Sequence, residues 1–322
     1  MTQLGQWPWS YDDPSGYPKH HSAVLTSFRI LAGKISLDGQ IRHIVGFEHE
    51  ADRGKGQPSM TATIASVVIS FAVLLAVFRT LELLRPRDTR LPILRAGFWT
   101  DLTYWVFTAF ATKAFTRLCV TFVLVPVALI VYGKLDRDLI SNGFGPASQL
   151  PLWLQAVLII ALADLVSYWM HRLFHGPWLW KFHAVHHSSQ VLDWLAAVRV
   201  HPINDALMRV MSTLPIIALG FAPKAVVGVT PILTLMAILI HANLDWDWGP
   251  LRSVIASPRF HRWHHTSESE GRDKNFAGFL PLWDILFGTY YMPKERAPTK
   301  FGTHTPVPSG LIGQLAYPFR RD

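Results

Sequence analysis

Three short clusters of histidine carry most of the chemistry that this sequence could perform. They follow the patterns HxxxH, HxxHH and HxxHH: His171 and His175; His183, His186 and His187; His261, His264 and His265. Residues three and four apart lie on one face of a helix, so each cluster can present its imidazoles together. A neutral imidazole is the commonest metal ligand, and its second nitrogen stays available for a hydrogen bond. The spacing therefore predicts that these eight side chains bind metal.

Eight imidazoles exceed what one metal ion uses. A structural zinc takes four ligands and a catalytic zinc takes three from the protein, so the set fits two ions. Imidazole binds Fe, Zn, Cu and Ni alike, so the residue types leave the metal open. No glutamate lies between Glu82 and Glu268. The glutamate-rich ligand sets of soluble di-iron bundles are therefore excluded, and the site must be built from nitrogen ligands.

Two histidines stand alone. His241 begins the segment His-Ala-Asn-Leu-Asp, and His201 lies in Arg-Val-His-Pro-Ile-Asn-Asp. A single histidine is either a metal ligand or a polar side chain satisfied by hydrogen bonds, and the sequence leaves both readings open. We include His241 among the metal ligands and keep His201 as a further candidate.

Polar residues near the histidines are candidates for supporting them. Asp164 and Tyr168 precede His171 by seven and three residues, which places them on the same helix face. An ionisable group inside an apolar run needs a partner. We therefore expect Asp164 to accept a hydrogen bond from a ligand histidine, the alternative being a packing or capping role. Tyr168 and Asn243 are assigned to the same supporting group.

The elements that must position these clusters are apolar enough for a membrane. Half of the 322 residues are hydrophobic, only 16% are charged, and the mean hydropathy is +0.23, whereas a soluble domain carries about 25% charge. About 20 apolar residues span a bilayer. The apolar runs are 61–84, 98–132, 151–170, 206–222 and 225–240, the last two forming an apparent helical hairpin joined at Pro223-Lys224. A soluble protein with buried helices is the alternative.

The distribution of basic residues predicts the topology. Lys and Arg mark 85–95, 172–209 and 252–262 as cytoplasmic, so the net charge of +8 is assigned to membrane-facing loops and no nucleic-acid partner is expected. If 134–150 is external, 98–132 crosses once, with an interfacial helix near 98–112 and the crossing at 116–133. The predicted fold class is all-α: a polytopic membrane helical bundle with a histidine-rich dimetal cap and the C-terminus on the cytoplasmic side.

The order HxxxH, seven residues, HxxHH, a long gap and HxxHH resembles the fatty acid hydroxylase / sterol desaturase superfamily of integral-membrane, non-haem di-iron oxygenases. The resemblance covers about 95–292, and the short gap between His175 and His183 separates the chain from the acyl-CoA desaturases. Further matching segments are Asp164-x3-Tyr168-Trp169, Arg199-x-His201-Pro202, His241-x-Asn243-Leu244, Ser257-Pro258-Arg259-Phe260-His261 and Asn275-Phe276-Ala277-Gly278 leading to Trp283-Asp284. The domains follow as a polar, disordered N-terminal extension (1–60), a first transmembrane helix and basic loop (61–95), a fatty acid hydroxylase-like catalytic membrane domain (96–292) and a basic C-terminal tail (293–322).

The resemblance implies the cofactor and the reaction. Two Fe ions are held by the eight clustered histidines and His241, with no catalytic residue assigned beyond the metal ligands. The enzyme uses O2 to hydroxylate or desaturate a C–H bond of a lipid drawn from the bilayer. Because the sequence contains no haem, ferredoxin or flavin module, a separate electron-donor protein, cytochrome b5-like or ferredoxin-like, is expected. The alternatives are a membrane zinc hydrolase and a non-catalytic metal- or haem-binding membrane protein.

Overall fold

The computed structural model describes residues 60–133 and 142–320. Its contacts divide the chain into Met1–Thr63 and Ile64–Asp322, and the account below concerns the second unit. The predicted N-terminal extension and residues 134–141 of the predicted external connection lie outside the described residues. Every regular element within the described ranges is a helix, so the all-α prediction is confirmed.

Four helical runs in the described part of the chain are long and apolar enough to cross a membrane. They are α3 (Met60–Leu84), the continuous run of α4 (Phe98–Phe107), a π-helical turn (Thr108–Thr112) and α5 (Lys113–Tyr132), then α7 (Leu152–Phe174) and α10 (Pro223–His241). A fifth helix, α9 (Pro202–Ala218), has 17 residues. The shorter helices are α8 (Trp180–His187), α11 (Pro258–His264), α12 (Leu282–Leu286) and α13 (Leu311–Ala316), and 3-10 turns occupy Pro146–Gln149, Trp194–Val198, Gly249–Ser253, Ser269–Gly271 and Tyr317–Phe319.

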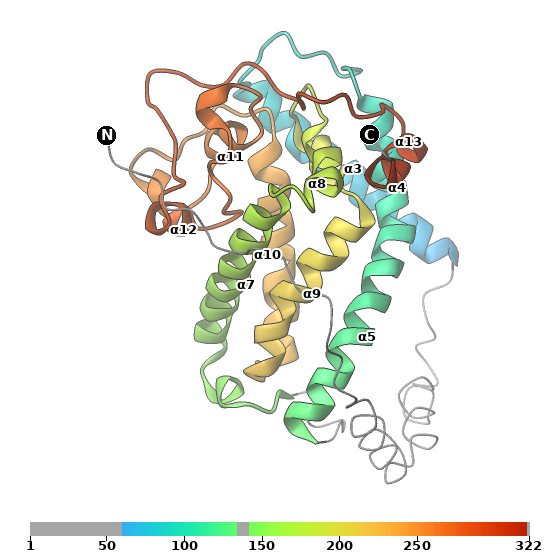
Figure 1. Ribbon diagram of the computed structural model, residues 1–322, viewed down its shortest axis with the longest axis vertical. Coiled ribbons are helices and arrows are strands. Elements are labelled where there is room, and N and C mark those ends of the chain that lie inside the picture. Colours follow the sequence, from blue (N-terminus) through green and yellow to red (C-terminus); the bar gives the residue numbers. More distant parts are fainter. Residues whose placement is uncertain (1–59, 134–141, 321–322) are drawn as a thin grey trace, which may run out of the picture. The chain divides into compact units, whose positions relative to one another are not determined.

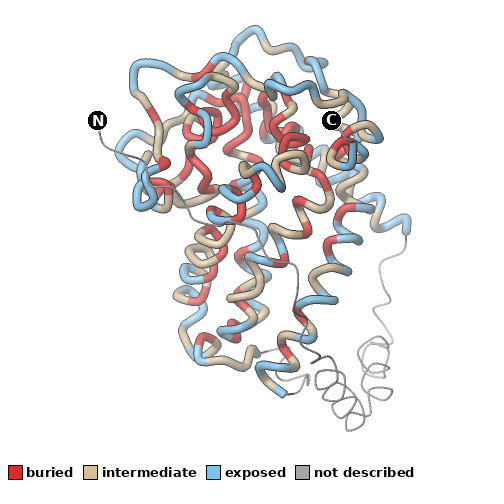
Figure 2. The backbone as a smooth tube through the Cα atoms, in the orientation of Figure 1, coloured by how far each residue is buried: buried red, intermediate tan, exposed pale blue. Residues whose placement is uncertain are grey.

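The long helices turn large apolar side chains outward. Phe122 is 83% exposed, Ile130 82% and Val227 70%. Such surfaces are costly in water and suit lipid, where a helix satisfies its own backbone polar groups. Figure 2 shows the complementary pattern, because buried residues gather at the end of the bundle that carries α8 and α11.

The run from Phe98 to Tyr132 is longer than one crossing needs. Its 35 residues extend over about 52 Å, against a hydrocarbon core of about 30 Å. At its beginning, Asp101 and Tyr104 are fully buried. Part of this run must therefore lie beyond the hydrocarbon core, while the interfacial placement of 98–112 stays a prediction.

Helices α5, α7, α9 and α10 lie side by side, with α8 and α11 across one end (Figure 1). Helices α9 and α10 follow each other through a turn at residues 219–222, earlier than Pro223-Lys224. They do not pack together as the expected hairpin, because α7 contacts both of them. Pro223 instead starts α10, because the first helical position tolerates its missing N–H. At this end Gly220 has a φ of 68°, and a Cβ on Gly145 would lie 2.1 Å from the Leu219 carbonyl oxygen. Backbone-to-backbone contact thus closes the bundle opposite α8 and α11.

A buried network of charged side chains links Arg95, which lies between α3 and α4, to residues 193–199 at the α8/α11 end of the bundle. Arg95 pairs with both Asp101 and Asp193, and the Arg199 Nε donates to Asp101 at 2.5 Å. Two arginines and two aspartates balance in charge, and their pairing raises the pKa of Arg95 despite its burial. The network therefore holds residues 193–199 in place next to the histidine clusters.

Candidate metal centre

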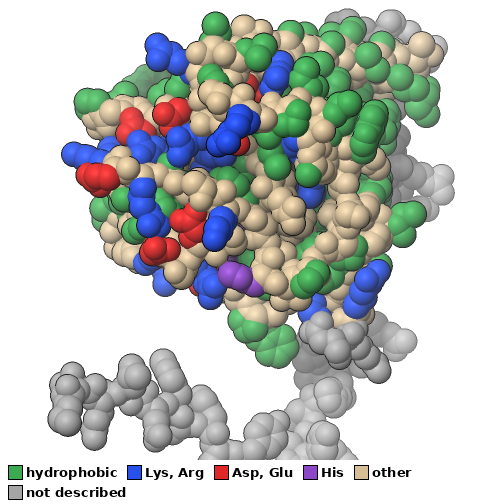
Figure 3. All heavy atoms as spheres, turned by 90° about the horizontal axis from the view of Figure 1, so that it is seen from above, with side chains coloured by type: hydrophobic (Ala, Val, Ile, Leu, Met, Phe, Trp, Pro, Cys, Tyr) green, Lys and Arg blue, Asp and Glu red, His purple; other side chains and the backbone are tan. Residues whose placement is uncertain are grey.

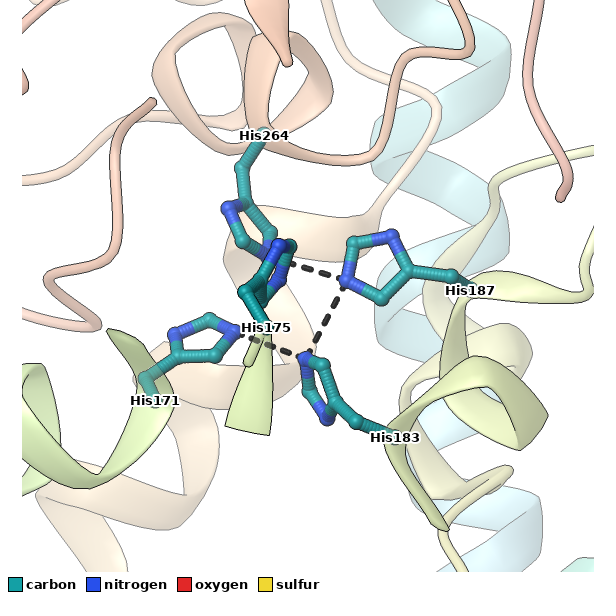
Figure 4. Close-up of side chains that lie close together, drawn as sticks. All are labelled: His171, His175, His183, His187 and His264. Atoms are coloured by element: carbon teal, nitrogen blue, oxygen red, sulfur yellow. Dashed lines mark hydrogen bonds between the residues drawn. The ribbon is translucent and has the colours of Figure 1, made fainter. Parts of the chain in front are cut away.

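Nine histidines converge in two groups at the α8/α11 end of the bundle. Within each group the ligand nitrogens all lie within 4.8 Å of one another. The five-histidine group consists of His171, His175, His183, His187 and His264 (Figure 4). The four-histidine group consists of His186, His241, His261 and His265. All nine are residues that the sequence proposes as ligands.

Each HxxHH cluster divides between the two groups. On α8, His183 and His187 enter the five-histidine group and His186 enters the other; on α11 the assignment is reversed, with His264 alone entering the five-histidine group. Residues i and i+4 are offset by about 40° around a helix while i+3 lies on the other side of residue i, so one helix can serve two adjacent sites. Helix α7 adds His171 and its capping residue His175, and α10 ends on His241.

The Nε2 atoms of the five-histidine group point at one another (Figure 4). Nε2 of His183 lies 2.9 Å from that of His171 and 3.1 Å from that of His187, whose Nε2 lies 3.0 Å from that of His264. In the four-histidine group, Nε2 of His241 lies 3.1 Å from those of His186 and His261.

In four of the rings, Nδ1 donates a hydrogen bond to a backbone carbonyl outside the two histidine groups. The Nδ1 atoms of His171 and His264 donate to the carbonyl oxygens of Phe276 (2.7 Å) and Lys274 (2.8 Å), and those of His186 and His241 donate to Arg199 (3.1 Å) and Ala237 (2.6 Å). A carbonyl can only accept, so in these rings the proton sits on Nδ1 and a lone pair on Nε2 faces inward. Converging lone pairs about 3 Å apart repel unless a cation lies between them. The donor set therefore fits a metal ion in each group.

The hydrogen-bonded Nε2 pairs are 2.9–3.2 Å apart, and all ligand nitrogens within a group lie within 4.8 Å of one another. These separations would allow the nitrogens of each group to bind one metal ion.

Burial keeps these imidazoles neutral. It lowers the pKa well below the ordinary value in six of them, and neighbouring histidines lower it further: His183, His186, His187, His261, His264 and His265. A neutral ring keeps the lone pair that a metal needs. The groups are therefore ready to bind metal at neutral pH.

His201 lies outside both groups. It caps α9, with its Nδ1 accepting the N–H of Ile203 and its Nε2 donating to the Leu315 carbonyl, each at 3.2 Å. Both of its ring nitrogens are engaged in hydrogen bonds, and the structure does not bring His201 into either histidine group. Here the His201 side chain takes the N-cap role that Ser, Thr, Asp or Asn usually fills.

The three predicted supporting residues also act differently from the expectation. Asp164 accepts backbone N–H groups of residues 278–280 at 2.7–3.1 Å, not a histidine. Tyr168 bonds Thr289, and Asn243 bonds the backbone of Asp88. Each holds a loop, so their support of the histidines is indirect.

The direct partners of the ligand rings include two side chains that the sequence did not single out. Asn204 bonds Nδ1 of His183 at 2.8 Å, and Asp273 bonds Nδ1 of His175 at 3.0 Å, which lowers the pKa of this carboxyl. The other partners are backbone carbonyls, which leave no residue-type signal. Asn204 could have been noticed three residues after His201, just beyond the segment Arg199-x-His201-Pro202 that matches the superfamily pattern.

A cavity of about 220 Å³ leads to the five-histidine group from outside. Its lining consists of Arg172, His175, Gly176, Asp273, Phe276 and Thr289. The Nε2 of His175 is buried and has no hydrogen-bond partner among the described residues. A small polar molecule can thus approach this group without crossing the apolar bundle.

Comparisons with known proteins agree with the arrangement of the histidines. Residues 156–289 match the family model described as fatty acid hydroxylase. Ornithine lipid hydroxylase OlsE of Rhizobium tropici is 33% identical over 54% of this chain and 53% of its own length. Alkylglycerol monooxygenase of Danio rerio is 35% identical over 41% of this chain and 30% of its own. The very-long-chain aldehyde decarbonylase GL1-6 of Oryza sativa subsp. indica is 27% identical over 52% and 27%.

The match thus spans about half the length of the first of these relatives and less than a third of the other two. No solved structure matches the chain. The matched segment contains all nine grouped histidines, from His171 to His265. This segment is therefore similar to the fatty acid hydroxylase family, as the order of the histidine clusters indicates.

Proposed function

We propose that the protein is a membrane-bound di-iron oxidoreductase that uses O2 to hydroxylate or desaturate a C–H bond of a lipid. One observation carries the proposal: nine imidazoles gather in two groups, and within each group the ligand nitrogens lie within 4.8 Å of one another. An all-nitrogen set of this size suits two iron ions better than tetrahedral zinc.

The nine histidines are the proposed ligands, five for one iron and four for the other. Iron bound by these nitrogens supplies the oxidation chemistry, the reduction of O2 and the attack on an unactivated C–H bond. The chain's own part is to keep the rings neutral by burial and to aim each Nε2 through the hydrogen bond at Nδ1. Helices α7 and α10 bring that site to the end of an apolar bundle, where a lipid can reach it from the bilayer.

The relatives support a lipid substrate and favour hydroxylation. Two of them are named for oxygen insertion, as a hydroxylase of ornithine lipid and a monooxygenase of alkylglycerol, and another for very-long-chain aldehydes. Their common chemistry is a long apolar chain attached to a polar group. We propose a polar membrane lipid of this class as the substrate.

We further propose that the site and the C-terminus lie on the cytoplasmic side and that a separate cytochrome b5-like or ferredoxin-like protein supplies electrons. Basic segments 85–95 and 252–262 belong to the same end as the histidines, because Arg95 pairs with Asp193 and Arg262 donates to the Leu192 carbonyl. The end face drawn in Figure 3 carries more Lys and Arg than acidic side chains. Such a surface attracts an acidic donor protein.

The proposal is tested by metal analysis and lipid profiling. Protein purified from membranes is expected to hold about two irons per chain, and cells lacking it are expected to lose a hydroxylated or desaturated lipid that re-expression restores. One zinc per chain, or haem absorbance, contradicts the assignment. So does a lipid profile that is unchanged when the protein is removed.

A further inference from the structure

We infer that the segment Asp273–Phe276, here called the strap, positions the five-histidine group, and that Asn275 is the residue that holds the strap in place. The inference rests on the proposed function only in requiring that the histidines bind metal. Asn275 touches no metal ligand ring, so it is a positioning residue and not a catalytic one.

The strap supplies the outer hydrogen bonds of three rings from four consecutive residues. His175 bonds the side chain of Asp273, His264 donates to the Lys274 carbonyl and His171 donates to the Phe276 carbonyl. These bonds fix which ring nitrogen carries the proton and how each ring is turned. Such partners contribute about 10- to 100-fold to metal affinity.

Asn275 stands at the centre of the strap. It is fully buried, and its φ of 58° lies in the left-handed region, where Asn is among the few non-glycine residues that fit. Its Nδ2 donates to the carbonyls of Phe260 (2.8 Å) and Tyr291 (2.7 Å), and its Oδ1 accepts the N–H of Tyr291 (2.7 Å). The bond to Phe260 ties the strap to α11, which carries His264. One amide thus sets the strap against two elements at once.

Two carboxylates fix the last residue of the strap and the four residues that follow it. Asp284 accepts the N–H groups of Phe276 and Ala277, and Asp164 accepts those of residues 278–280. Five consecutive amides are therefore held from the side of α7 and α12. Asn275 is the side chain that links the strap to α11.

The four-histidine group draws no hydrogen bond from the strap. The Nδ1 atoms of His186 and His241 donate to the carbonyls of Arg199 and Ala237, and those of His261 and His265 have no partner among the described residues. Loosening the strap is therefore expected to weaken one metal site and spare the other.

The test is N275D. Aspartate tolerates the left-handed backbone and keeps the acceptor, but it loses both donors. At limiting iron, purified N275D is expected to hold about one iron per chain where the wild type holds about two, with an affinity about 10- to 100-fold weaker at the affected site. Excess ferrous iron restores the second equivalent, because all nine ligands remain. Asn275→Gly, which fits the backbone without strain, is expected to behave likewise.

The matched control is Q155E. Gln155 is also a buried amide with the same three bonds, donating to the carbonyls of Ser148 and Leu150 and accepting the N–H of Ala222, but it lies at the opposite end of the bundle. Q155E is expected to keep about two irons. If N275D and Asn275→Gly bind iron as the wild type does, or if Q155E loses as much as N275D, the inference is overturned.

Two double variants identify the site that is lost. N275D combined with H186A is expected to hold no iron at limiting metal, because each change empties a different group. N275D combined with H264A is expected to hold about one, because both act on the five-histidine group. If the double variant with H186A keeps about one iron and the double variant with H264A keeps none, the inference is overturned. A wild-type protein without metal instead refutes the proposed function, so the two failures are distinguishable.

Discussion

Replacing His186 by alanine tests the division of the nine histidines most directly. His186 is the only residue of α8 in the four-histidine group, and its Nε2 lies 3.1 Å from that of His241. The variant leaves three nitrogens in that group and five in the other. We expect H186A to lose one iron selectively and to lose its activity.

The magnitude follows from the ligand count. Four-ligand metal sites bind with about 10–16 kcal/mol, so one ligand contributes about 3 kcal/mol, or roughly 100-fold in affinity. The variant also leaves the Arg199 carbonyl, which accepts from His186 at 3.1 Å, without its partner, at a cost of about 1–3 kcal/mol in stability. Iron at this site is therefore lost at concentrations that still fill the five-histidine group.

The assay is the iron content of protein purified in detergent, with H201A as the control. His201 is equally buried and also makes two hydrogen bonds, but it belongs to neither group. H201A is expected to lower the thermal midpoint through loss of a helix cap worth about 1 kcal/mol while keeping about two irons. Equal iron loss in both variants refutes the division of the histidines.

Three further predictions concern charge, pH and topology. Arg95→Met leaves the charges of Asp101 and Asp193 less compensated in the buried network and is expected to lower the free energy of unfolding by about 3–5 kcal/mol. In denaturant titrations, the double variant Arg95→Met/Asp193→Leu should lose less stability than the sum of the two single variants, and strict additivity contradicts the network. The buried histidines have lowered pKa values, so below pH 6.5 the unfolded chain binds more protons than the folded one. Stability and iron content should therefore be full at neutral pH and fall with acidification, the free energy of unfolding by up to about 1.4 kcal/mol per pH unit for each such histidine. Retention of both stability and iron down to pH 5 contradicts the burial argument. A reporter fused after residue 322 should be active on the cytoplasmic side, and a signal from the other side reverses the assigned orientation.

Local spacing was sufficient to find the ligand candidates. Helical periodicity brings residues three and four apart together, so the clusters around His171, His183 and His261 could be recognised without knowledge of the fold. The division between two groups could not be recognised in this way, because it depends on how α8 and α11 face each other. The resemblance to the superfamily, by contrast, needed only the order and gaps of the clusters, and it is confirmed.

The residues that hold the ligands were harder to predict. Asp164 was placed on the correct helix face, yet its partners are amides more than a hundred residues later in the chain, at residues 278–280. His201 has the motif context of a ligand, but it serves as a helix cap. Backbone carbonyls that orient rings, such as that of Phe276, have no residue type to mark them, so only the tertiary fold reveals them.

The inward-facing lone pairs have a consequence for the life of the protein in the cell. Nine imidazoles carried by α7, α8, α10 and α11 or by the residues that cap them converge in two groups. Without a cation, the repulsion between their lone pairs works against the packing of these segments. A ligand that binds only the closed form stabilises it by mass action. During iron starvation the loops around the histidines should open first and become substrates for proteases. The abundance of the protein is then expected to follow iron supply without any dedicated regulator.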